Sequence, residues 1–193
     1  MIAHLCANEK TAVSRRRFLT SALAFTALTM RPFKAMASMT TGEEEKRLRL
    51  FNPRTKEVLE TTFCDQDGYA PRALADIDYL MRDLRSEEIK SIDTRLVDLL
   101  YDIQTRLQLE EPIHIISGYR SPATNERLRK QGWAASRNSY HLHGKAVDIR
   151  HPKTSTAGLR RAAFELKQGG VGYYPRLNFV HLDMGPLRFW RKD

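Results

Sequence analysis

The chain has 193 residues, and its 32 lysines and arginines exceed its 23 aspartates and glutamates to give a net charge of +9. Hydrophobic residues make up 41% of the sequence, which suffices for one globular domain with a sizeable core and argues against a disordered chain. Basic and aromatic residues do not alternate along a common stripe, so the positive charge does not indicate a nucleic acid as partner.

The first 37 residues have the features of an export signal. The motif SRRRFL at residues 14–19 carries a twin-arginine pattern, a modestly apolar stretch covers residues 21–30, and Ala-Met-Ala at 35–37 provides a cleavage site. The apolar stretch is shorter than the about 20 residues that a transmembrane helix needs. We therefore predict a twin-arginine signal peptide over residues 1–37, recognition by the twin-arginine export machinery, a location in the periplasm, and no stable membrane span after cleavage.

Cleavage after this signal would change both the charge and the cysteine count. The segment contains six basic residues and one acidic residue, so the net charge of the remaining chain would be +4. Cys6 would be removed, and Cys64 would have no second cysteine for an intramolecular disulfide. We therefore expect a flexible leader over residues 38–46 and a domain over residues 47–193 that is held together by its hydrophobic core.

The predicted elements of this domain combine strand and helix patterns without regular alternation. In chain order they are a strand hairpin at 48–63, helices at 77–84 and 96–107, a buried strand at 112–117, a helix that begins at Ser121, a helix at 156–167, and two strands at 171–174 and 179–182. This order favours an α+β fold over a parallel α/β fold. We expect a single domain with a small antiparallel sheet, flanking helices and a metal site on the sheet.

Two segments, residues 141–148 and 179–183, carry the residue types of a catalytic metal site. His141 and Asp148 frame a short segment that contains Gly144, and His181 lies in an apolar strand pattern. Strand alternation places Asp183 on the same face as His181. Three protein ligands leave the fourth position of a tetrahedral Zn²⁺ open to water, which is the arrangement of a catalytic rather than a structural zinc. The pattern therefore predicts a zinc site formed by His141, Asp148 and His181.

Two neighbouring side chains are further candidates for the site. Arg120 lies at the end of a predicted strand and just before a helix, where it is placed to hold a carboxylate or a carbonyl oxygen, or to form a surface salt bridge. His143 would share a face with His141 if both lay in a strand. A third histidine beside a complete ligand set more often orients a ligand or lies at the surface.

Taken together, these motifs resemble a known group of zinc peptidases. The pattern SxHxxGxAxD at residues 139–148 resembles the zinc motif of the LAS group, which includes lysostaphin-type enzymes and D-Ala-D-Ala metallopeptidases. SGYRS at 117–121, GGVGYY at 169–174 and FVHLD at 179–183 are similar to murein endopeptidase K and its relatives. The resemblance implies a periplasmic zinc endopeptidase that cuts cross-links between peptidoglycan stem peptides, with His141, Asp148 and His181 as ligands and Arg120 as a substrate-binding residue.

One position departs from the pattern of many LAS enzymes. They carry a catalytic base two or three residues before the last ligand, where this chain has Phe179 and Asn178, and neither side chain takes a proton from water at neutral pH. Asp183 and His143 are therefore the candidate proton carriers, and Asp183 could instead orient a ligand. Two other functions stay open: a non-catalytic, zinc-dependent peptidoglycan-binding protein, and a D-Ala carboxypeptidase.

Overall fold

A computed structural model describes residues 45–133 and 135–193, so the predicted signal peptide and most of the predicted leader lie outside the described residues. In chain order the described elements are β1 (Lys46–Phe51), β2 (Val58–Asp65), β3 (Gly68–Tyr69), α1 (Pro71–Leu80), α2 (Thr94–Arg106), β4 (Ile113–Ser117), α3 (Pro122–Lys130), the 3₁₀ helix η1 (Tyr140–His143), β5 (Ala146–Arg150), α4 (Thr156–Leu166), β6 (Gly170–Tyr174), β7 (Phe179–Asp183) and β8 (Arg188–Arg191). None of the helices in this part of the chain is long and apolar enough to cross a membrane.

All eight described strands belong to one sheet, in the order β3-β2-β1-β4-β5-β7-β6-β8. The predicted α+β class is confirmed, but the sheet is larger than predicted and it is mixed rather than antiparallel. β1 pairs in parallel with β4, and β6 pairs in parallel with β8. The first parallel pair arises because α1 and α2 lie between β3 and β4, and a connection of that length can return the chain to the sheet in the original direction.

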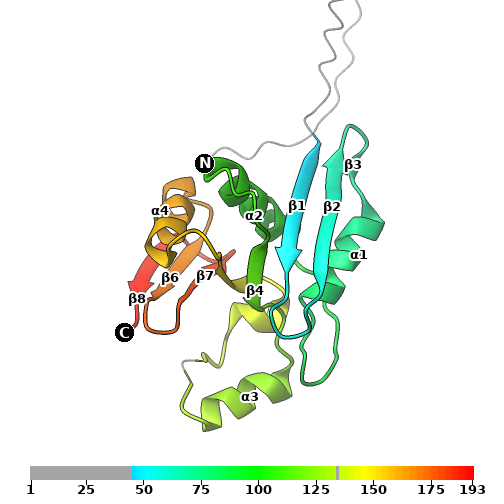
Figure 1. Ribbon diagram of the computed structural model, residues 1–193. Helices are drawn as coiled ribbons and strands as arrows, with labels where there is room; N and C mark the ends of the chain where they lie inside the picture. Colours follow the sequence, from blue (N-terminus) through cyan, green and yellow to red (C-terminus); the bar gives the residue numbers. More distant parts are fainter. Residues whose placement is uncertain (1–44, 134) are drawn as a thin grey trace, which may run out of the picture. The chain divides into compact units, whose positions relative to one another are not determined.

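Three helices cover one face of the sheet, and the core lies between them and the strands (Figure 1). α1 packs on β2, α2 packs on β1 and on α4, and α4 packs on β6 and β7. The strands contribute buried side chains to this face at every second position: Leu48, Leu50, Ile113, Ile115, Val147, Ile149, Val180 and Leu182. Burying one such side chain contributes about 1.5–3 kcal/mol. The residues between them point to the opposite face, which carries the site.

Local sequence signals fix where the helices begin. Asp93 caps α2 by accepting a hydrogen bond from the backbone of Arg95, and Ser121 caps α3, where proline occupies the first helical position. α1 begins at Pro71, earlier than the predicted stretch at 77–84, because proline starts that helix as well. α3 lies apart from the other three helices, beyond the end of β4 (Figure 1).

Candidate metal centre

The site is built on a row of residues that crosses five adjacent strands. The register pairs Ser117 with Asp148, Asp148 with His181, His181 with Gly172, and Gly172 with Trp190. Because paired residues on neighbouring strands share a face, all five lie on the face that the helices leave open. Two of the predicted ligands, Asp148 and His181, are therefore direct neighbours although 33 positions separate them in the chain.

The third predicted ligand, His141, comes from η1 just before β5. The residue is 1% exposed, and its Nδ1–H donates to the carbonyl oxygen of Gly118 at 2.6 Å. η1 ends at Gly144, whose φ of 64° suits glycine, and a Cβ there would lie 2.2 Å from the carbonyl oxygen of Ser91. Gly144 thus lets the chain turn tightly against the α1–α2 loop and holds His141 over β5.

His143 lies on a different side of this turn from His141. A strand would place the two histidines on one face, but residues two apart in a 3₁₀ helix differ by about 240°. His143 is exposed and is not among the described residues that line the pocket around His141. The segment forms a helical turn and not a strand, so the condition for a shared face is not met and His143 lies at the surface.

The three predicted ligands offer one atom each to a common point. His141 Nε2 lies 3.3 Å from His181 Nδ1 and 3.4 Å from Asp148 Oδ1, and His181 Nδ1 lies 2.8 Å from Asp148 Oδ1. Atoms bound to a tetrahedral Zn²⁺ at about 2.0–2.1 Å would lie about 3.3–3.4 Å apart. Two of the three separations match this value and the third is shorter, so the donor set fits a zinc ion. No other cluster of three such ligands occurs among the described residues.

The charges of the site also suit a cation. Burial acts to raise the pKa of Asp148, but the neighbouring His141 and Arg120 outweigh it and hold that pKa well below its usual range. Burial lowers the pKa of His141. Burial also acts to lower the pKa of His181, but hydrogen bonds to Asp148 and Asp183 raise it overall. At neutral pH the site therefore contains an ionised Asp148, whose negative charge favours a cation.

Asp183 lies behind His181, on the side of the ring away from Asp148. It is 0% exposed, and its Oδ2 accepts a hydrogen bond from His181 Nε2 at 3.1 Å. Arg188 donates to both of its carboxylate oxygens at 3.0 and 2.7 Å, and the backbone of Gly185 donates at 2.8 Å. Asp183 is not among the described residues that line the pocket. This placement favours the role of orienting His181 over that of carrying a proton to or from water.

Two glycines of β6 allow β8 to support His181 and Asp183 of β7. A Cβ on Gly170 would lie 2.6 Å from both Arg188 Nη1 and Asp183 Oδ2, and a Cβ on Gly172 would lie 2.5 Å from the indole of Trp190. Arg188 and Trp190 fill these two gaps and reach across β6. Neither Arg188 nor Trp190 was predicted as a site residue, although glycines at alternate positions of a strand are a signal of such close approach.

Arg120 contacts the ligand set directly. Its Nη2 pairs with Asp148 Oδ2 at 2.5 Å, and its Nε donates to Ser117 Oγ at 2.8 Å. The side chains of Arg120 and Asp148 are 15% and 5% exposed, so this is a largely buried ion pair and not a surface salt bridge. Arg120 therefore fixes the carboxylate of Asp148 and leaves its Oδ1 to the two histidines.

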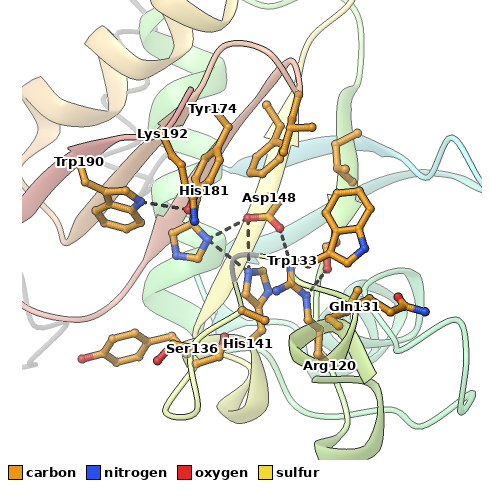
Figure 2. Close-up of a pocket in the computed structure, with 18 of the residues that line it drawn as sticks. Arg120, Gln131, Trp133, Ser136, His141, Asp148, Tyr174, His181, Trp190 and Lys192 are labelled. Atoms are coloured by element: carbon orange, nitrogen blue, oxygen red, sulfur yellow. Dashed lines mark hydrogen bonds and ion pairs between the residues drawn. The ribbon is translucent and has the colours of Figure 1, made fainter. Parts of the chain in front are cut away.

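The ligand set lies in a pocket of about 730 Å³. Figure 2 shows Trp190 and Tyr174 on one side of His141, Asp148 and His181, and Trp133 on the other. Trp190 Nε1–H donates to the Tyr174 hydroxyl at 3.1 Å, which fixes the two rings relative to each other. A pocket of this size, with aromatic walls and a few convergent polar groups, is typical of a binding site.

Comparison with known proteins assigns the family. The sequence model of the family described as peptidoglycan L,D-endopeptidase MepK matches residues 40–190. The peptidoglycan L,D-endopeptidase MepK of Escherichia coli (strain K12) is 38% identical over 182 residues, which cover 94% of this chain and 100% of the relative. The probable peptidoglycan L,D-endopeptidase MepK of Haemophilus influenzae is 39% identical over 158 residues, which cover 81% of this chain and 85% of the relative. The resemblance predicted from the motifs is confirmed, and the chain belongs to the MepK family of peptidoglycan L,D-endopeptidases.

Proposed function

We propose that this protein is a zinc-dependent endopeptidase that hydrolyses peptide cross-links in bacterial peptidoglycan. The observation that carries the proposal is the convergence of His141 Nε2, Asp148 Oδ1 and His181 Nδ1 within a large pocket. Relatives that match most of this chain are described as peptidoglycan L,D-endopeptidases, which gives the reaction and the substrate class.

The hydrogen bonds of the two histidines support zinc as the metal. His141 donates its Nδ1–H to Gly118, and His181 donates its Nε2–H to Asp183. Each ring therefore has its other nitrogen available as a ligand, which is the usual arrangement of metal-binding histidines. When bound, Zn²⁺ would supply Lewis acidity, which polarises an amide carbonyl and lowers the pKa of water.

The remaining residues of the site would bind and orient. Arg120 holds Asp148 in place and lines the pocket, where the guanidinium N–H groups that Ser117 and Asp148 do not use could donate to a carbonyl or carboxylate oxygen of the substrate. Asp183 fixes the ring of His181 from behind. Trp190 and Trp133 would hold the peptide from opposite sides (Figure 2).

The form of the pocket bears on the kind of peptidase. Its described lining comes from both sides of the ligand set, with Trp190 and Tyr174 on one side and Gln131 and Trp133 on the other (Figure 2). Such a lining would contact substrate residues on both sides of the cleaved bond, as an endopeptidase requires. A carboxypeptidase would need one end of the pocket to be closed around a terminal residue.

One observation favours the non-catalytic alternative, a zinc-dependent peptidoglycan-binding protein. Asp148 is the only carboxylate among the described residues that line the pocket, and it belongs to the ligand set. A general base of the usual kind is therefore lacking from this lining, and such a group contributes about 10²–10⁴-fold to the rate.

The place of action is a further part of the proposal. The twin-arginine motif at residues 14–19 and the cleavage site at 35–37 support export of the folded protein to the periplasm, where peptidoglycan lies. Both motifs lie outside the described residues.

Digestion of purified cross-linked peptidoglycan by the zinc-loaded protein, with separation of the products by mass, tests the proposal. Conversion of peptide dimers to monomers is expected. Release of terminal D-Ala alone would indicate the carboxypeptidase, and co-sedimentation without products would indicate the binding protein.

His141→Ala and His143→Ala form a matched pair for the metal site, because the two histidines are two residues apart and only the first lies in the ligand set. His141→Ala should lose zinc in metal analysis, and His143→Ala should retain it. Loss of cleavage with full zinc content in His143→Ala would identify His143 as the proton carrier.

A further inference from the structure

The pocket carries more positive charge than the candidate metal centre uses. Five basic side chains line it: Arg54, Arg85, Arg120, Arg188 and Lys192. Arg120 and Arg188 are neutralised by ion pairs with Asp148 and Asp183. Within the described part of the chain, no ion pair engages Arg54, Arg85 or Lys192. Lys192 lies with Trp190 on one side of the ligand set (Figure 2).

Arg54 and Arg85 form a separate corner of the pocket, close to Arg120. Arg54 lies in the turn between β1 and β2, and Arg85 lies in the loop between α1 and α2. Both also line a small adjoining hollow, together with Arg120 and Ser117. Two segments that are distant in the sequence thus bring to the same pocket two arginines that form no ion pair within the described residues.

The backbone at both arginines is anchored to buried side chains. The backbone N–H of Arg54 donates to Asn52 Oδ1 at 3.0 Å, and that of Arg85 donates to Asp83 Oδ1 at 2.9 Å. Asn52 and Asp83 are 4% and 3% exposed. Because these turns are already fixed, less conformational entropy of the protein is lost when a ligand binds.

A third arginine joins the two turns by pairing with an acidic residue beside each of them. Arg82 is buried and donates to both carboxylate oxygens of Glu57, at 3.1 and 3.2 Å, and to Glu87 at 2.9 Å. Glu57 follows the turn of Arg54, and Glu87 follows Arg85. Arg82 therefore holds Glu57 and Glu87. The third carboxylate beside the corner, Asp83, accepts hydrogen bonds from the backbone of Arg85 and of Ser121. Within the described residues none of these carboxylates forms an ion pair with Arg54 or Arg85, which leaves both guanidinium groups for a ligand.

We propose that Arg54 and Arg85 form a carboxylate-binding subsite, which holds a free carboxylate of a stem peptide at a distance from the cleaved amide. Guanidinium groups match carboxylates through paired N–H donors. The protein would then prefer stem peptides whose side-chain or terminal carboxylates are free over stem peptides in which they are amidated. This inference rests on the proposed function, because it assumes that the same pocket binds a stem peptide.

The test compares Arg54→Gln, Arg85→Gln and the double variant on synthetic cross-linked peptides with free or amidated carboxylates. We expect each single change to raise KM about threefold to fivefold and the double change to raise it about tenfold, with kcat unchanged, as for partly exposed charge pairs. Amidation of the bound carboxylate should raise KM in the unaltered protein but not in the double variant, because both changes remove the same contact.

Lys56→Gln and Lys90→Gln are the matched controls. They remove one positive charge from the same turn and the same loop, at exposed positions that are not among the described residues lining the pocket. Their KM should stay within about twofold, as is usual for isolated surface charges. A rise in KM equal to that of the arginine variants would show a general effect of net charge and would overturn the subsite.

Two further results would also overturn the subsite. One is an unchanged KM in the double variant. The other is a KM that rises in the double variant while the effect of amidation persists in full.

Titration of an uncleaved stem peptide, followed by tryptophan fluorescence, separates this inference from the proposed function. Binding that depends on the two arginines without any cleavage would support the subsite and refute the peptidase. Normal cleavage that is insensitive to amidation would support the peptidase and refute the subsite.

Discussion

Replacing Asp183 by asparagine tests how the candidate metal centre is supported. The two oxygens of Asp183 receive four hydrogen bonds, from His181 Nε2, from Gly185 N and from two nitrogens of Arg188. Asparagine has one acceptor oxygen, and its NH₂ group would face two hydrogen-bond donors. Position 183 is 0% exposed, so water cannot replace the lost acceptor. We expect the loss of this support to weaken zinc binding about 10–100-fold, which corresponds to about 1.4–2.7 kcal/mol.

The folded protein should also lose stability in Asp183→Asn. A buried donor without an acceptor costs about 1–3 kcal/mol, and the 40% exposure of the Arg188 side chain keeps the cost toward the lower end because water can solvate it. Zinc affinity is measured by competition with a chelating dye, and stability is measured by urea unfolding of the zinc-free protein.

Asp193→Asn is the matched control for this variant, because Asp193 is an exposed carboxylate that pairs with Arg191 at the end of the same chain segment. The zinc affinity and the stability of Asp193→Asn should equal those of the unaltered protein within experimental error. Refutation would come from an Asp183→Asn protein that keeps its zinc affinity and its stability but loses cleavage. That result would make Asp183 a proton carrier and not an orienting residue.

Three other changes have defined outcomes. Gly172→Ala would place a Cβ 2.5 Å from the indole of Trp190, so it should cost about 1–3 kcal/mol of stability and shift the tryptophan fluorescence; an unchanged spectrum and stability would contradict the close approach. Burial acts to raise the pKa of Asp83, but the hydrogen bonds to its carboxylate outweigh burial and lower that pKa. The ionised carboxylate therefore stabilises the fold above the unfolded-state pKa of about 3.9, and this stabilisation is lost as the pH falls through the folded-state pKa. Asp83→Asn should therefore reduce the free energy of unfolding at pH 7, and its difference from the unaltered protein should shrink in acid; a difference independent of pH would argue against this linkage. Replacing both Arg15 and Arg16 by lysine should leave the precursor in the cytoplasm on cell fractionation, whereas unchanged export would point to another route.

The convergence of His141, Asp148 and His181 could be predicted because it depends on local patterns. Strand alternation placed His181 and Asp183 on one face, and the short glycine-containing segment brought His141 near Asp148. The contact between Arg120 and Asp148 depends on how β4 and β5 are aligned, including an irregularity between Ile115 and Ser117. No local pattern specifies that alignment, so the sequence left open whether Arg120 binds a carboxylate of the protein, a substrate or solvent.

The edges of the sheet were harder to predict than its centre. β8 follows only four residues after β7, and its sequence RFWR lacks an alternation of apolar and polar residues. Its role appears only when Arg188 and Trp190 are seen to reach across the glycines of β6. β3 has two residues, which is too short for a periodic signal. The parallel pairings depend on chain crossings, which are global properties of the fold.

Two of the three proposed zinc ligands lie on regular strands of the sheet, whereas much of the pocket rim comes from turns and loops. Arg54, Arg85 and Leu177 occupy three different connections, and none of them belongs to the ligand set. Exposed connections tolerate substitution far better than buried strands do. Substrate preference in this fold can therefore diverge by mutation of the rim while the hydrolytic centre stays constant, and libraries that randomise these connections offer a direct route to altered cross-link selectivity.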